Sequence, residues 1–151
     1  MNYEYKKILP EDVYVTIFDR EASEEELWKG LPRNFGGNRP TDNNFIDLFA
    51  RLVRSYQHAE VKFYAAQMNV NELHFNSAIQ ALTGISAKEW RTRYILLSAC
   101  ELLKSTDMSI TEIAKRLNFT SITVFSRFFM QHTKLRPIIW RSRNKGQTEQ
   151  A

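Results

Sequence analysis

Residues 109–129 read SITEIAKRLNFTSITVFSRFF, a run of helix-capping, turn and large apolar residues. Ser109 followed three residues later by Glu112 is a capping box, which predicts the start of a short helix. Asn118 suits a left-handed turn, and Ser121 can cap a second helix. That second helix would bury Phe125, Phe128 and Phe129. The spacing predicts a short helix, a tight turn and a second helix with a large apolar anchor.

The same unit occurs about fifty residues earlier in the chain. Each copy carries alanine where two helices would cross, because a close crossing requires a small residue. The matched pairs are Ala65 with Ala114, Met68 with Leu117, Asn69 with Asn118, Val70 with Phe119, Phe75 with Phe125, Ile79 with Phe129 and Trp90 with Trp140. Each copy ends in Trp-Arg-x-Arg, at 90–93 and 140–143. A tandem pair of helix-turn-helix units follows, and such units place their second helix in the DNA major groove.

Helices are also predicted between and before the two units. Thr41 or Asp42 would cap a helix that runs to about residue 58. Its apolar stripe comprises Phe45, Leu48, Phe49, Leu52, Val53 and Tyr56. Further helices are expected at 61–68, 71–82 and 87–104, with Gly84 as a left-handed C-cap. The final helix should begin near Pro137.

The N-terminal segment has a different character. Val13–Phe18 is β-branched and aromatic, which predicts a short strand. The capping box Ser23–Glu26 predicts a short helix, and the Pro- and Gly-containing stretch 31–41 predicts a linker.

These residues resemble the AraC/XylS-type transcription regulators. The motif that carries the resemblance comprises Ser109–Ala114, Leu117–Phe119 and Phe125–Phe129, closing on Pro137 and Trp140-Arg141, and the similarity extends over about 45–143. The resemblance implies an all-α fold of two helix-turn-helix subdomains joined by one long helix. The expected divisions are an N-terminal segment and linker at 1–44, a first subdomain at 45–86, a linker helix at 87–104, a second subdomain at 105–145 and a disordered tail at 146–151.

The chain departs from the family pattern at several positions. Ser77 and Gln80 stand where arginine and lysine are common, Met130 where lysine is usual, and Ile95 where arginine is common. Asn118, Lys134 and Arg136 replace glycine, glycine and serine. Fewer charges should therefore point into the groove.

Charge and composition agree with a nucleic-acid partner. The 151 residues carry a net charge of +4, divided as −3 over residues 1–44 and +7 over 45–151. A basic body favours binding to an anionic partner. The sequence has neither an apolar run of membrane-spanning length nor a signal peptide, so a cytoplasmic protein is expected. Cys100 is the only cysteine, which excludes a disulfide framework, and it is interpreted as a small hydrophobe.

Candidate contact residues lie on the outer faces of the two second helices and near the repeated arginines. The expected DNA base contacts are Leu73, Asn76, Ser77, Gln80, Ile122, Thr123, Val124, Ser126 and Arg127. The expected phosphate contacts are Asn71, Arg91, Arg93, Ser121, Arg136, Arg141 and Arg143. The alternative for each set is a solvated helix face. Trp90 and Trp140 are interpreted as core residues rather than base-stacking platforms.

The sequence thus predicts a sequence-specific regulator of transcription that binds double-stranded DNA, with RNA polymerase as an open second partner. A monomer or a weak homodimer is expected, with no membrane partner. No catalytic constellation, cofactor motif or metal-ligand spacing is present, so no enzyme, cofactor or metal site is expected. Two alternatives stay open: an accessory architectural factor of a mobile element, and a protein-interaction adaptor with a degenerate first unit. The 44 residues before the first subdomain are too few for the sensor domain of full-length relatives, which implies a small, sensorless member.

Overall fold

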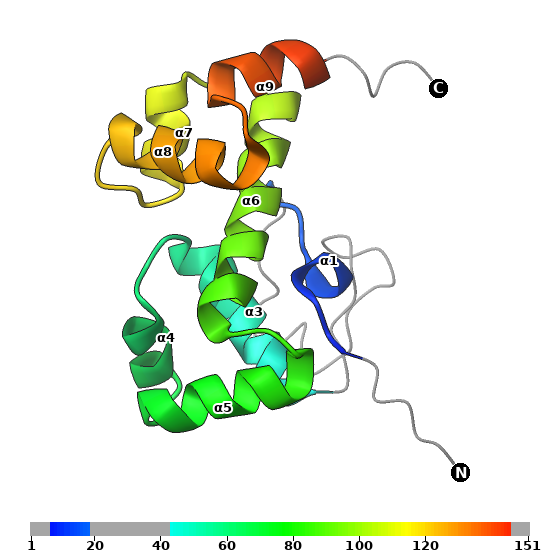
Figure 1. Cartoon of the computed structure of the whole chain (residues 1–151), viewed down its shortest axis with the longest axis vertical. Helices are drawn as coiled ribbons and strands as arrows, with labels where there is room; N and C mark the ends of the chain where they lie inside the picture. The colour runs from blue at the N-terminus through cyan, green and yellow to red at the C-terminus, as the bar shows by residue number, and fades with distance from the viewer. Residues whose placement is uncertain (1–6, 19–42, 146–151) are drawn as a thin grey trace.

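The computed structural model describes residues 7–18 and 43–145, and this part of the chain is built from helices (Figure 1). Their bounds are α1 Pro10–Val13, α3 Asn44–Tyr56, α4 Val61–Gln67, α5 Glu72–Thr83, α6 Ala87–Ser105, α7 Ile110–Arg116, α8 Ile122–Thr133 and α9 Pro137–Asn144. The expected all-α class is confirmed.

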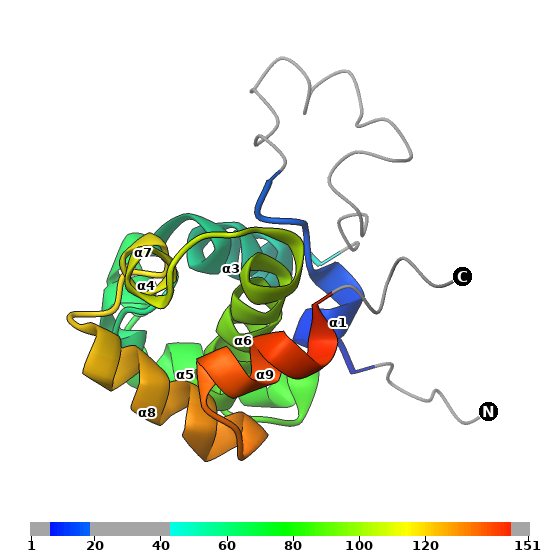
Figure 2. The ribbon, with the colours of Figure 1, turned by 90° about the horizontal axis from the view of Figure 1, so that it is seen from above.

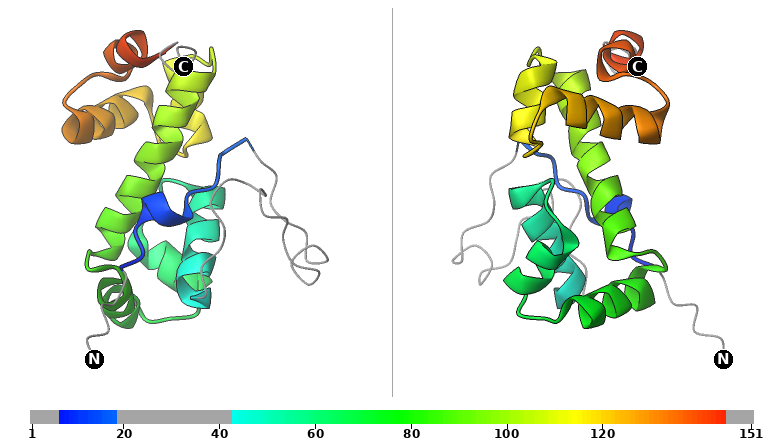
Figure 3. Two further views of the ribbon diagram at one scale, coloured as in Figure 1. Left: turned by 90° about the vertical axis from the view of Figure 1, so that its right-hand side faces the viewer. Right: turned by 60° about the vertical axis from the view of Figure 1, so that its left-hand side comes forward.

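The long helix α6 is the axis of the molecule. Helices α3 and α5 pack against the N-terminal part of α6, while α7 and α9 pack near its C-terminal end (Figures 1 and 3). Helix α4 completes the first unit through α3 and α5, and α8 completes the second through α7 and α9. One long helix therefore carries both helix-turn-helix units.

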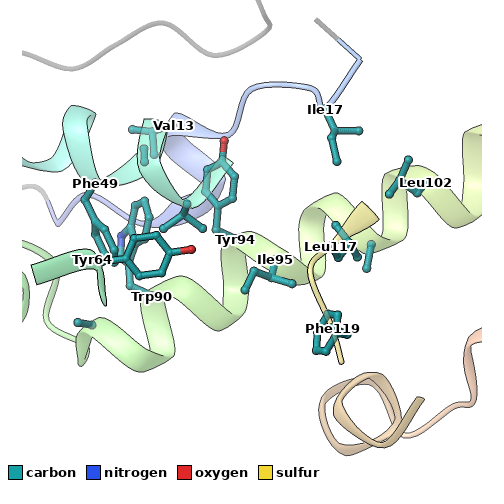
Figure 4. Close-up of a cluster of buried hydrophobic side chains, with 14 of the residues drawn as sticks. Val13, Ile17, Phe49, Tyr64, Trp90, Tyr94, Ile95, Leu102, Leu117 and Phe119 are labelled. Atoms are coloured by element: carbon teal, nitrogen blue, oxygen red, sulfur yellow. The ribbon is translucent and has the colours of Figure 1, made fainter. Parts of the chain in front are cut away.

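A continuous hydrophobic core fixes both units to α6. Trp90, Tyr94 and Leu103 of α6 are buried, with Phe49 and Phe129 representing the two units. Figure 4 shows the rings of Phe49, Tyr64 and Trp90 together, and Leu117 and Phe119 farther along α6. Ala65 and Ala114 are both buried at the matched positions, as the repeat predicts. Each fully buried large side chain contributes about 1.5–3 kcal/mol of hydrophobic stabilisation, which favours a fixed arrangement.

Local signals set most helix ends. The side chains of Asn71, Ser109 and Ser121 accept hydrogen bonds from the first-turn amides of α5, α7 and α8. Gly84 ends α5 at φ 80°, in the left-handed region where glycine has no steric penalty. The predicted caps Ser109, Ser121 and Gly84 are confirmed. The first cap is different, because Asn43, and not Thr41 or Asp42, accepts the hydrogen bond that opens α3.

The predicted strand at Val13–Phe18 is wrong. Pro10–Val13 forms a helical turn, and the chain then has a single β-bridge residue at Val15. This segment is held against α6: the Glu101 Oε1 atom accepts hydrogen bonds from Tyr14 Oη, Thr16 Oγ1 and the Ile17 amide, at 3.1, 2.6 and 2.8 Å. The Glu101 carboxylate thus fixes this segment to α6.

The apolar stripe of α3 is narrower than predicted. Phe49 and Val53 are buried, but Leu48 and Tyr56 are exposed. Ile46 and Ala50 take their places in the core, which rotates the buried face by about one residue. The predicted helix at Ser23–Glu26, the linker at 31–41 and the tail at 146–151 lie outside the described residues.

Candidate nucleic-acid interface

Helices α5 and α8 are the second helices of the two units, and they lie on the same side of α6 (Figures 2 and 3). Each is anchored by two fully buried side chains at matched positions, Phe75 and Ile79 in α5 and Phe125 and Phe129 in α8. Because the anchors occupy the inner face, the side chains on the opposite face of each helix point outward. The molecule therefore presents two similar helices on one surface.

The outer face of α5 is mostly uncharged. Leu73 is 72% exposed, which is unusual for a large apolar side chain. Ser77 and Gln80 are also exposed, and Asn76 is half-buried. The structure brings these four predicted base contacts onto one helix face. Amide and hydroxyl groups at such positions can exchange hydrogen bonds with base edges.

The outer face of α8 borders a groove of about 360 Å³. Of the five predicted base contacts, Ile122, Thr123, Val124 and Arg127 are exposed and Ser126 is half-buried. The groove is lined by Ile110, Ile122, Thr123, Ser126, Arg127, Met130, Arg136, Pro137 and Ile138. It brings Arg127 of α8 beside Arg136 at the start of α9.

Two exposed apolar residues of this groove are not among the predicted contacts. Met130 and Ile138 are 44% and 57% exposed, although both are large and apolar. Met130 follows Arg127 at helical spacing, so the outward face of α8 could have indicated it. Ile138 lies on α9, and its place in the groove depends on how α9 packs against α8.

Asn71 and Ser121 occupy the N-termini of α5 and α8. Their side chains accept hydrogen bonds from Leu73 N and Val124 N at 2.8 and 3.2 Å, and both residues are exposed. The first amides of a helix favour a nearby anion. The two helices therefore present similar N-terminal ends to solvent.

Arg91 is a correction to the predicted phosphate contacts. Its side chain is turned inward, the residue is only 7% exposed, and its Nη1 donates a hydrogen bond to the Ala59 carbonyl. Burial lowers the pKa of Arg91 from its ordinary value, and Tyr64 and Glu60 oppose that shift. The guanidinium connects α6 to the loop before α4, so Arg91 is a structural residue and not a surface cation.

The other predicted phosphate contacts divide into two groups. Arg141 matches Arg91 in the repeat and is half-buried, with its Nε donating to the Leu103 carbonyl at 2.9 Å. Arg93 makes an ion pair with Glu89 at 3.2 Å and keeps about a third of its side chain exposed. Arg136 and Arg143 are exposed. In each Trp-Arg-x-Arg ending, the first arginine thus bonds to the backbone and the second lies nearer the solvent.

Other chemistry is sparse in the described part of the chain. Residues 7–18 and 43–145 contain no cluster of three His, Cys, Asp or Glu side chains placed to hold a metal ion. Burial raises the pKa of the Cys100 thiol to about 11, although Lys104 opposes the shift. The same described residues include no helix that is long and apolar enough to cross a membrane.

The family comparison decides the assignment. A family model described as a helix-turn-helix domain matches residues 64–143, which span both recognition helices and α6. The chain belongs to the AraC/XylS-type helix-turn-helix family. The resemblance inferred from the sequence is confirmed.

Two curated relatives are regulators by name. The chain is 29% identical over 109 residues to the MmsAB operon regulatory protein of Pseudomonas aeruginosa, covering 70% of this chain and 36% of that protein. It is 30% identical over 77 residues to the regulatory protein PocR of Salmonella typhimurium, covering 51% of this chain and 25% of that protein. The chain therefore spans about a third or less of the length of these relatives.

Solved structures share the fold. The DNA-binding domain of AdpA, a global transcriptional factor crystallised with a target DNA, superposes with a TM-score of 0.63 at 22% identity, covering 73% of this chain and all of that one. The C-terminal domain of AraT, a response regulator from Geobacillus stearothermophilus, gives a TM-score of 0.61 at 24% identity, covering 67% of this chain and 85% of that one. At these identities, the likeness shows the arrangement of helices.

Proposed function

We propose that this protein is a sequence-specific regulator of transcription that inserts α5 and α8 into successive major-groove segments of double-stranded DNA. The observation that carries the proposal is the placement of two matched helices on one side of α6, each anchored by two fully buried apolar side chains. An α-helix fits the major groove, where each base pair presents a distinct pattern of donors and acceptors. Two helices on one rigid axis would read two segments about one helical turn apart.

The outward side chains suit direct reading of bases. Asn76 and Gln80 carry amides that can pair bidentately with adenine, and the apolar ends of Leu73, Ile122 and Val124 can contact thymine methyls. Ser77, Thr123 and Ser126 supply hydroxyls that can donate or accept. Arg127 can donate two hydrogen bonds to guanine O6 and N7. The two helices would therefore read different sequences, and α8 would favour guanine at one position.

Phosphate contacts would orient the protein without reading sequence. Arg136 beside Arg127 and Arg143 on α9 are exposed cations, while Arg93 and Arg141 are partly exposed. The capped N-termini at Asn71 and Ser121 add backbone amides that favour anions. Arg91 is left out of this set because its guanidinium is engaged inside the protein.

The relatives' names support a regulatory role, since both are called regulatory proteins. We propose residues 45–86 and 105–145 as the two DNA-reading subdomains, with 87–104 as the linker helix. One chain already carries two reading helices, so a monomer would suffice for binding. We also propose a cytoplasmic location, with RNA polymerase as an open second partner.

The test is selection from a random pool of DNA duplexes, followed by titrations at several salt concentrations. A selected motif and a clear loss of affinity with salt are expected, because neutralised phosphates release counterions. Arg127→Ala should cost about 1–3 kcal/mol on the selected site and relax the preference at one base pair. Arg143→Ala is the matched control: it removes the same charge from α9 and should weaken binding to all sequences alike.

The outcomes separate the candidate functions. No selected motif together with a salt slope near zero would reject DNA reading. If the selected motif is unchanged in Arg127→Ala, Arg127 is not the main base contact. A footprint on a single groove segment would show that the first unit no longer reads DNA, as the adaptor alternative requires.

A further inference from the structure

The loop between α3 and α4 makes a direct connection to the turn of the second unit. The His58 amide donates a hydrogen bond to the Leu117 carbonyl at 3.0 Å. In return, the Asn118 side-chain amide donates to the carbonyls of Tyr56 and His58 at 3.3 and 3.0 Å. Three hydrogen bonds therefore link the two units directly, in addition to the connection through α6.

Ring packing reinforces the same contact. The His58 imidazole stacks on Phe119, with ring centroids 4.2 Å apart and planes 15° from parallel. It also meets Phe128 of α8 at 6.0 Å and a steep angle of 69°. His58, Phe119 and Phe128 thus form an aromatic contact directly beside the recognition helix of the second unit.

The first-unit side of this contact is rigid. Gln57 is 1% exposed and has φ 55°, and its carbonyl accepts a hydrogen bond from Tyr64 Oη of α4. The Gln57 side chain donates a hydrogen bond to the Arg54 carbonyl of α3. Two residues further along the loop, the Ala59 carbonyl accepts a hydrogen bond from Arg91 of α6. Side chains of α4 and α6 therefore hold the loop that Asn118 contacts.

The second-unit side is equally constrained. Leu117 and Phe119 are buried on either side of Asn118, which has φ 63°. Ser121, the N-cap of α8, is separated from Phe119 by Thr120 alone. The position of this turn therefore sets where α8 begins. A shift of Asn118 relative to residues 56–58 would consequently move the start of α8.

The matched residue of the first unit shows what is particular to Asn118. Asn69 has nearly the same backbone conformation, with φ 56°, and it is exposed. Within the described residues, its side chain makes no hydrogen bond to the second unit. Both asparagines satisfy the left-handed turn, but Asn118 alone of the pair joins the two units through its side chain.

We propose that Asn118 is a positioning residue that fixes the separation and rotation between the recognition helices, so that the protein discriminates between half-sites at different spacings. The inference rests on the proposed reading of DNA by α5 and α8. Adding one base pair moves the second half-site by about 3.4 Å and rotates it by about 35°. A rigid pair of helices cannot follow such a change, whereas a loosened pair can adapt to it.

The experiment compares binding to sites of different spacing. The site selected by the wild-type protein is prepared with its natural spacing and with one base pair inserted or removed between the half-sites. Affinities are measured by fluorescence anisotropy at fixed salt for the wild type, Asn118→Gly and the control Asn69→Gly. Glycine keeps the left-handed turn and removes only the side chain.

The spacing penalty is the loss of affinity when one base pair is inserted or removed. We expect this penalty to be about fivefold smaller in Asn118→Gly than in the wild type, because a fivefold change corresponds to one or two modest hydrogen bonds. Asn69→Gly should keep the wild-type penalty within about twofold. Asn118→Asp places a carboxylate against two carbonyl oxygens, so its penalty should fall at least as far. Circular dichroism checks that each variant is folded.

The outcomes distinguish this inference from the proposed function. A wild-type protein that selects no motif, or protects one half-site only, rejects the two-helix reading itself. A wild type that reads both half-sites, with an unchanged penalty in Asn118→Gly and Asn118→Asp, overturns the positioning role alone. An equal loss of discrimination in Asn69→Gly would also overturn it, since that change leaves the contact between the units intact.

Discussion

At the scale of single residues, the repeated Trp-Arg-x-Arg ending serves mainly to hold the fold. Trp90 is fully buried, and its indole Nε1 donates to the Ile8 carbonyl at 3.0 Å. Trp140 is half-buried and meets Phe129 edge to face at 5.9 Å. Arg91 and Arg141 donate to backbone carbonyls, which satisfies acceptors that would otherwise lack a partner. The second arginine of each copy is left to meet a phosphate.

The two arginines of the first copy should therefore respond differently to substitution. Arg91→Ala leaves the Ala59 carbonyl without its donor and opens a buried space, and we expect it to lower the free energy of unfolding by about 2–3 kcal/mol. Arg93→Ala breaks an exposed pair with Glu89 and should cost about 0.3–0.5 kcal/mol. Urea unfolding of both variants measures the difference. Equal losses would contradict the structural role of Arg91.

The outward-facing side chains of α5 and α8 can be predicted from the sequence more readily than the inward-facing Arg91. Leu73, Gln80 and Arg127 were identified because buried anchors leave only certain helix positions for solvent. The prediction that Arg91 contacts phosphate is wrong, because the side chain of an arginine that follows a core tryptophan can point either to solvent or to the interior. Its direction depends on the Ala59 carbonyl, which is 32 residues away in the chain.

At the scale of elements, helix boundaries follow from local chemistry. A serine or asparagine cap acts on amides two or three residues ahead, so the sequence alone predicts the starts of α5, α7 and α8. The segment 13–18 could not be predicted in this way. Its alternating β-branched and aromatic residues suit a strand, but its acceptor is the Glu101 carboxylate on α6. A pairing over that distance leaves no local pattern.

The ends of α5 and α8 offer a matched comparison. Both helices stop at a left-handed residue, Gly84 at φ 80° and Lys134 at φ 66°. Only glycine adopts this conformation without a steric cost from Cβ. Lys134 therefore carries strain that its counterpart lacks.

We expect Lys134→Gly to raise the free energy of unfolding by about 0.5–1 kcal/mol, because it relieves that strain. Gly84→Ala should lower it by about 1 kcal/mol, and the added Cβ would also come within 3.0 Å of the flexible Lys7 side chain. Urea or thermal unfolding of the two variants provides the measurement. Changes of the same sign would contradict the argument from backbone conformation.

At the scale of the whole molecule, the repeat predicts two similar units but not how they sit on each other. The units are joined by α6 and by the contact of Tyr56 and His58 with Asn118 and Phe119. The sequence predicts a left-handed turn at Asn118, and this prediction is confirmed. Its second role is the contact with the carbonyls of Tyr56 and His58. These residues lie 62 and 60 positions earlier in the sequence, and only the folded chain brings them to Asn118.

The same contact should make the stability of the molecule depend on pH. Burial lowers the pKa of His58 from its ordinary value, and the positive charge of Arg91 lowers it further. The neighbouring cavity of about 400 Å³ also brings Lys88 and Glu89 of α6 and His132 of α8 to this region. The neutral imidazole is therefore the form that the contact favours.

The direction of the pH effect follows from proton binding. Since the folded pKa lies below the unfolded one, the unfolded chain binds the proton more tightly. The stability from His58 is complete above the ordinary pKa of about 6.5 and is lost as pH falls toward the lowered value. We expect the wild type to lose more stability between pH 8 and pH 5 than His58→Gln, in which this group no longer titrates. Urea midpoints across that range measure the difference, and parallel curves for the two proteins would show that protonation of His58 does not weaken the contact.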